Sequence, residues 1–204
     1  MKYIKTFEQK NNESILLIVD VQKSFSKYFT LMYINQLNKY CNEFSDVYQI
    51  FDNHVDGKNV SKDYLYKENP EIPVHDDLYN FPNQKDIIEK RYNYDVNVYF
   101  YKKILNKEVY NEIKHKEDNN LLKRGDYFYT KEGTIIVYIG NNHIWYHCPK
   151  KLYNLFKQLD GKEITMVGGS DSECYLDVET TAKSLGVNVK RNYKYIYSAN
   201  HCPL

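Results

Sequence analysis

The sequence lacks a net charge of either sign, a long apolar run and any recognisable secretion signal. Its 28 Lys and Arg residues nearly cancel its 27 Asp and Glu residues, leaving a formal net charge of +1. Such a balance gives no general attraction to nucleic acid or to a membrane surface. No apolar stretch approaches the roughly 20 residues needed to cross a bilayer, and the opening MKYIKTFEQKNNES has no apolar signal segment. We therefore expect a cytoplasmic protein that binds neither nucleic acid nor membrane.

Cysteine is scarce and irregularly spaced. Four cysteines occur in 204 residues, at Cys41, Cys148, Cys174 and Cys202. None forms a CxxC pair, and the irregular spacing does not indicate a disulfide framework, so a reducing compartment is the simpler expectation. Hydrophobic residues make up 42% of the chain, enough for one sizeable core. We therefore expect a single domain over residues 1–204.

Short apolar runs alternate with amphipathic segments, which is the pattern of an α/β fold. The segment SILLIVD (14–20) is a nearly unbroken apolar run and predicts a strand buried on both faces, as in a parallel sheet. Further strands are predicted at 46–54, near 87–88, at 163–169 and at 187–191, and helices at 33–44, 149–161 and 173–186. A strand, a helix and a strand in this order predict a parallel crossover.

Residues 125–147, GDYFYTKEGTIIVYIGNNHIWYH, have a different character. β-branched and aromatic residues alternate around the turn sequences KEG and GNN, which predicts a β-hairpin or small meander. The preceding segment, 96–116, is predicted to be helical, and residues 56–82 are predicted to form an extended loop. The chain thus predicts a doubly wound, mostly parallel sheet flanked by helices, with a β-rich insertion at about residues 100–150.

Reactive side chains follow several of the predicted strands. Asp20 closes the first strand, Asp52 and His54 close the second, Lys90 follows the third, and Cys174 follows a later one. In an open parallel sheet, ligands bind at the carboxyl ends of the strands. Each residue alone has a structural explanation, such as a helix cap or core packing. Their coincidence at one edge predicts a site there.

Cys174 has the strongest physical case among these residues. If a helix starts there, unpaired N–H groups and the helix dipole favour thiolate over thiol, and the Lys90 ammonium acts in the same direction. Asp20 could take the thiol proton and pass it to a leaving amine. The backbone N–H groups of Glu173 and Cys174 would face a developing oxyanion. This arrangement predicts acyl transfer.

Three segments carry a family resemblance. LLIVDVQKSF (16–25), DIIEKRYNY (86–94) and VGGSDSECYLDVETTAKSLGVNV (167–189) resemble the isochorismatase-like cysteine hydrolases. The resemblance implies a catalytic triad of Asp20, Lys90 and Cys174, and a cis peptide just before the cysteine. It also implies homo-oligomers and no organic cofactor.

The nicotinamidase branch of that superfamily adds a metal site. By resemblance, Asp52, His54 and His75 would hold Zn²⁺ or another divalent cation, and such a ligand set suits zinc. The alternative is that both histidines are ordinary loop residues. The sequence also departs from the branch at three positions: Asn53 replaces an aromatic residue, Asp76 a cysteine and Tyr175 a valine.

The resemblance implies a cysteine hydrolase that cleaves the C–N bond of a small carboxamide, with nicotinamide as the first substrate to test. Two alternatives stay open. The insertion could retune the site for another small metabolite, such as a ureido acid or a nucleotide-derived compound. The fold could also serve as a binding or interaction module, in which case Cys174 would react like an ordinary thiol.

Overall fold

The computed structural model describes residues 14–52, 77–90, 104–141 and 144–198, and its centre is a five-stranded parallel sheet. The strands lie in the order β3-β2-β1-β7-β8. Their bounds are β1 Ile15–Val19, β2 Asp46–Asp52, β3 Gln84–Lys90, β7 Glu163–Gly168 and β8 Asn188–Ile196. All five residues of β1 are buried, as expected for a central strand covered on both faces.

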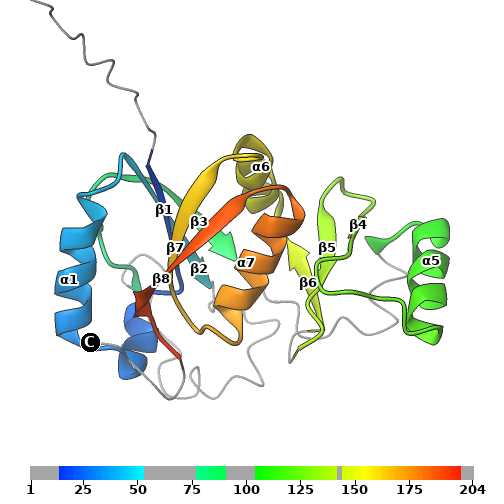
Figure 1. Ribbon diagram of the computed structural model, residues 1–204, viewed down its shortest axis with the longest axis horizontal. Helices are drawn as coiled ribbons and strands as arrows, with labels where there is room; N and C mark the ends of the chain where they lie inside the picture. The colour runs from blue at the N-terminus through cyan, green and yellow to red at the C-terminus, as the bar shows by residue number, and fades with distance from the viewer. Residues whose placement is uncertain (1–13, 53–76, 91–103, 142–143, 199–204) are drawn as a thin grey trace, which may run out of the picture.

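Helices cover both faces of this sheet (Figure 1). Helix α1 (Leu31–Cys41) lies on one face, and α6 (Lys150–Gln158) and α7 (Cys174–Ser184) lie on the other. A short 3-10 helix, η1 (Lys23–Tyr28), precedes α1. The predicted α/β fold with a parallel sheet flanked by helices is therefore confirmed. Among the described residues, no helix is both long and apolar enough to cross a membrane.

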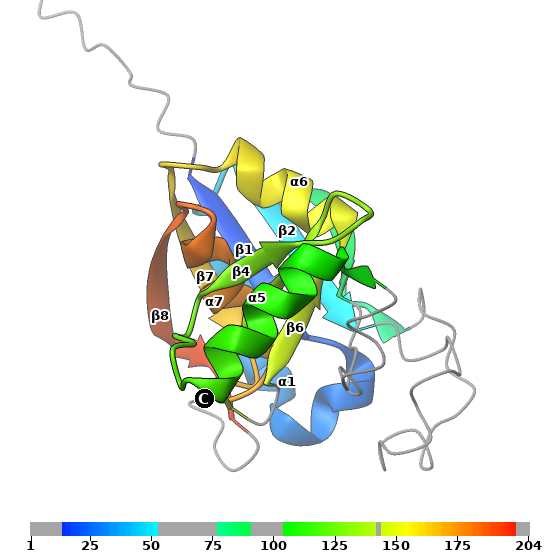
Figure 2. The same ribbon diagram turned by 90° about the vertical axis from the view of Figure 1, so that its right-hand side faces the viewer.

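The predicted β-rich insertion forms a separate three-stranded antiparallel sheet, β4-β5-β6. Its strands are β4 Tyr127–Tyr129, β5 Ile135–Tyr138 and β6 Trp145–Cys148, and helix α5 (Lys107–Asp118) precedes them. Figure 2, viewed from the side of the insertion, shows α5 lying across this small sheet. Of the segment 96–116 predicted to be helical, residues 96–103 lie outside the described part, and the helix begins at Lys107 after Leu105 and Asn106, which are not helical.

Strand alternation gives the small sheet two apolar faces. Val137 and Tyr146 point inward and join the core that includes β1, α6 and α7. Ile136 and Trp145 point outward and pack with Ile113 of α5. Successive residues of a strand point to opposite faces, so one short apolar run can serve both layers. The insertion is thus packed onto the α7 side of the main sheet.

The direction of strand addition reverses between β1 and β7. From β1 the chain adds β2 and β3 on one side, whereas β7 and β8 lie on the other. Crevices at such reversal points are where open α/β sheets bind ligands. Close pairing here requires Gly168, whose φ is 102° and where an added Cβ would lie 2.0 Å from the Val19 carbonyl oxygen. The final strand is longer than predicted from 187–191, reaching Ile196.

Candidate active site

A buried ion pair lies at the carboxyl edge of the main sheet. Lys90 ends β3, Asp20 follows β1, and the Lys90 Nζ donates to Asp20 Oδ2 at 2.8 Å. The side chains are 0% and 1% exposed. Asp20 has a φ of 52°, a left-handed conformation that Asp adopts more readily than most residues. Lys90 reaches across β2 to make this contact, so two residues 70 positions apart form one charged unit.

Cys174 is the first residue of α7 and is partly exposed. Burial raises the pKa of its thiol well above the usual value; Lys90 opposes this, while Asp20, Asp177 and Asp52 reinforce it. Burial of the sulfur therefore opposes the thiolate expected from a helix start beside Lys90. Desolvation outweighs the favourable dipole and cation because thiolate burial is costly.

Lys90 keeps its charge despite complete burial. Burial alone would lower its pKa, but Asp20, followed by Cys174, Asp52 and Asp177, raises it well above the usual value. The ammonium is thus a fixed positive charge close to Cys174. A buried cation with a carboxylate partner is a common feature of catalytic sites.

A tight turn leads from β7 to Cys174. It contains a cis peptide between Gly169 and Ser170, whereas the resemblance implies one just before Cys174. The Ser170 carbonyl accepts hydrogen bonds from the N–H groups of Glu173 and Tyr175, both at 3.0 Å. The Glu173 N–H therefore already has an acceptor within the turn, and the oxyanion role predicted for it stays a prediction.

Asp52 lies at the same edge, at the end of β2, and is 7% exposed. The Gln22 side chain holds its backbone, accepting from the Asp52 N–H at 2.8 Å and donating to its carbonyl at 3.1 Å. The Gln22 amide also donates to Asp77 Oδ2 at 2.7 Å. The other two predicted metal ligands, His54 and His75, lie outside the described residues. Within the described ranges, no group of three or more metal-ligating side chains is present.

Sequence reasoning missed three residues near Cys174. Asp177 is 1% exposed and lies three positions after Cys174 on α7, a spacing that places both on one helix face and could have identified it. Tyr197 follows β8, and its hydroxyl donates to the Asp20 carbonyl at 2.6 Å. Tyr146 comes from β6 of the insertion, and no local pattern links it to the sheet edge.

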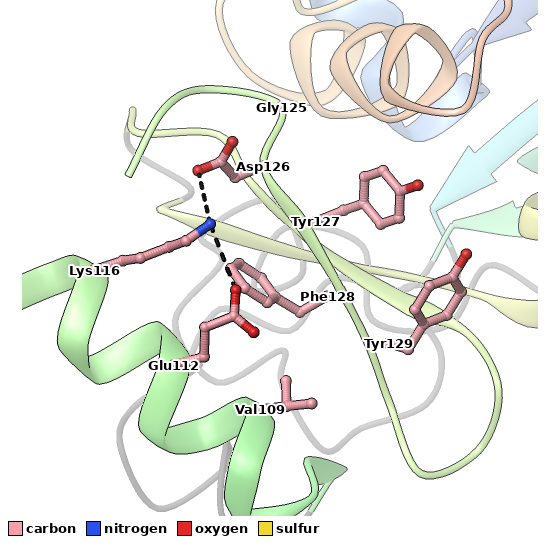
Figure 3. A pocket seen from close by; sticks show the side chains of 8 residues that line it. All are labelled: Val109, Glu112, Lys116, Gly125, Asp126, Tyr127, Phe128 and Tyr129. Atoms are coloured by element: carbon pink, nitrogen blue, oxygen red, sulfur yellow. Dashed lines mark ion pairs between the residues drawn. The ribbon is translucent and has the colours of Figure 1, made fainter. Parts of the chain in front are cut away.

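A separate groove of about 390 Å³ lies between α5 and β4 (Figure 3). Lys116 pairs there with Glu112 at 3.6 Å and with Asp126 at 3.9 Å. Phe128 points toward α5, whereas Tyr127 and Tyr129 point to the other side of β4. None of the predicted catalytic residues lines this groove.

Comparisons with protein families, with characterised proteins and with solved structures find no match to this chain. The chemistry of the site must therefore be argued from its own residues.

Proposed function

We propose that this protein is a cysteine hydrolase that cleaves the C–N bond of a small carboxamide, on a fold of the isochorismatase-like type. The observation that carries the proposal is the buried Asp20–Lys90 pair beside a partly exposed Cys174 at the start of a helix. These groups meet where the strand order reverses, the usual ligand position in such sheets. A nucleophile, a base and a fixed cation are the parts that acyl transfer requires.

The proposed reaction starts from the neutral thiol. As the sulfur attacks the carboxamide carbon, Asp20 takes the thiol proton, and the Lys90 ammonium stabilises the negative charge. The Cys174 N–H, at the start of α7, is the proposed donor to the oxyanion. Collapse of the tetrahedral intermediate breaks the C–N bond, and Asp20 returns the proton to the leaving amine. Water then hydrolyses the thioester, releasing the carboxylic acid and restoring the thiol.

A divalent cation is a further part of the proposal. Asp52 would be one of its ligands, with His54 and His75 as the predicted others. The carboxylate is an appropriate donor for Zn²⁺, and Gln22 fixes the backbone of Asp52. When bound, such an ion could orient a substrate ring nitrogen. The steps above depend only on Asp20, Lys90 and Cys174.

A panel of small carboxamides, beginning with nicotinamide, tests the proposal. We expect ammonia release by the purified protein, its loss in Cys174→Ala, and a thioester mass on Cys174 after acid quenching. Cys41→Ala is the matched control, because that buried thiol packs on the α1 face, in a different core cluster from the one that Cys174 packs against. Full activity in Cys174→Ala would contradict the proposal.

The resting protonation of Cys174 can be measured separately, and this measurement does not distinguish the hydrolase from a binding module. Because burial raises its thiol pKa above 9.0, the rate of iodoacetamide labelling at Cys174 should still rise about tenfold per pH unit between pH 7 and 9. Site-resolved mass spectrometry separates this thiol from the others. A rate that levels off below pH 8 would show a stabilised thiolate at rest.

A further inference from the structure

Tyr146 occupies an unusual position for a buried tyrosine. It is 2% exposed, and among the described residues its hydroxyl has no hydrogen-bond partner. Buried polar groups nearly always have a partner, because leaving one unsatisfied costs free energy. The unused hydroxyl therefore needs an explanation.

Packing places Tyr146 on the catalytic side of the main sheet. It belongs to the core cluster that contains Val19 and Ile88, and Cys174 packs against the same cluster. Val19 directly precedes Asp20, and Ile88 lies on the same face of β3 as Lys90, two residues on. The insertion is also tied to the turn before Cys174, since Asn141 Nδ2 donates to the Ser172 carbonyl at 2.9 Å.

The electrostatic surroundings of Tyr146 agree with that placement. Burial raises the pKa of Tyr146 well above its usual value; Cys148, Asp177 and Asp20 act in the same direction, and Lys90 opposes them. The hydroxyl therefore stays protonated and can donate a hydrogen bond. Asp20, one of the residues that act on Tyr146, also has a buried oxygen, Oδ1, without a hydrogen-bond partner among the described residues.

We propose that the insertion completes the substrate site, with the Tyr146 hydroxyl donating a hydrogen bond to a neutral acceptor on the carboxamide substrate. This inference rests on the proposed function and adds to it a residue that would bind the substrate. Tyr146 is thus a specificity residue supplied by the insertion.

Two alkylating reagents test the role of Tyr146 without requiring turnover. Iodoacetamide carries a neutral acceptor, whereas allyl iodide has a similar shape and no such acceptor. We expect Tyr146→Phe to slow iodoacetamide labelling of Cys174 by roughly two- to tenfold, the worth of one hydrogen bond. Allyl iodide labelling should be unchanged. The ratio of the two rates cancels any change in sulfur ionisation.

Tyr33→Phe is the control, because Tyr33 is an equally buried tyrosine on the α1 face and should leave both rates unchanged. An unchanged ratio in Tyr146→Phe, or equal slowing with both reagents, would overturn the role of Tyr146.

These outcomes are separate from those of the proposed function. If the ratio of the two labelling rates is unchanged in Tyr146→Phe but Cys174-dependent hydrolysis is observed, only the role of Tyr146 is contradicted. Hydrolysis can also be absent while the ratios behave as expected, which would leave a carboxamide-binding site without the proposed reaction.

Discussion

The two faces of the main sheet treat buried hydroxyl groups differently. On the α1 face, the Tyr33 hydroxyl donates to the Tyr195 carbonyl at 2.9 Å, and that of Tyr197 to the Asp20 carbonyl at 2.6 Å. On the α7 face, the Tyr146 hydroxyl has no partner among the described residues. On the α1 face both of these hydroxyls have acceptors within the protein, whereas the α7 face retains a hydroxyl that a ligand could satisfy.

The packing of the α1 face supports this contrast. Phe29 lies with its ring centroid 5.4 Å from that of Tyr33 and 5.2 Å from that of Tyr197. Tyr33 and Tyr197 meet edge to face at 6.1 Å. Such pairs stabilise a core beyond the area that they bury. The α7 face instead combines its apolar core with the charges of Asp20, Lys90 and Asp177.

The largest expected effect on stability comes from removing the buried positive charge of Lys90. Lys90→Met leaves Asp20 buried without its partner and should lower the free energy of unfolding by about 3–5 kcal/mol, measured by urea denaturation. Lys85→Met is the matched control: it breaks an ion pair with Asp46 of similar length, 2.9 Å, but at an exposed lysine. That loss should be about 0–1 kcal/mol.

The double variant Asp20→Asn/Lys90→Met sharpens this result. Because it removes both charges, it should recover much of the stability lost in Lys90→Met. If Lys90→Met and Lys85→Met lowered the free energy of unfolding equally, the buried ion pair would contribute no more to stability than the surface pair.

Alkaline pH should affect the α1 face through Cys41. Burial raises the pKa of this thiol from 9.0 to about 12, with a backbone hydrogen bond opposing. A raised thiol pKa stabilises the folded protein below pH 9, and this contribution is lost as the pH rises from 9 to 12. The unfolded chain ionises first, so the stability should fall by up to about 1.4 kcal/mol per pH unit from this group.

The variant Cys41→Ala should make the fall of stability between pH 9 and 12 less steep. Leu37→Ala, which also truncates a buried side chain of α1, should lower the stability at every pH and leave the slope unchanged. Comparing slopes cancels the tyrosines that titrate in the same range. The same slope in both variants would show that Cys41 does not titrate as inferred.

Much of the sheet could be predicted because its signals are local. The apolar run in β1 and the glycine that follows α6 mark element type and boundaries without tertiary information. The meeting of Asp20 with Lys90 also followed from one general rule, that parallel strands bring their carboxyl ends to the same edge. His54 and His75 stay predictions.

What could not be predicted depends on packing between distant segments. Burial raises the pKa of Cys174, and the sequence around the cysteine does not reveal that burial. The Glu173 N–H is engaged because the turn brings the Ser170 carbonyl to it. Tyr146 joins the site only because the insertion folds back over α7. Sequence patterns assigned the reactive groups, whereas tertiary contacts decide their charge and their neighbours.

The smallest expected effect on stability comes from making the same Tyr→Phe substitution on each face of the sheet. Tyr33→Phe removes a hydrogen bond that is made and leaves the Tyr195 carbonyl without it, so the free energy of unfolding should fall by about 1 kcal/mol. Tyr146→Phe removes a hydroxyl that has no partner among the described residues, so without ligand the stability should be unchanged or slightly higher. Urea denaturation of both variants measures the difference. A loss of 1 kcal/mol or more in Tyr146→Phe would mean that its hydroxyl is already satisfied in the resting protein, and the contrast between the faces would disappear.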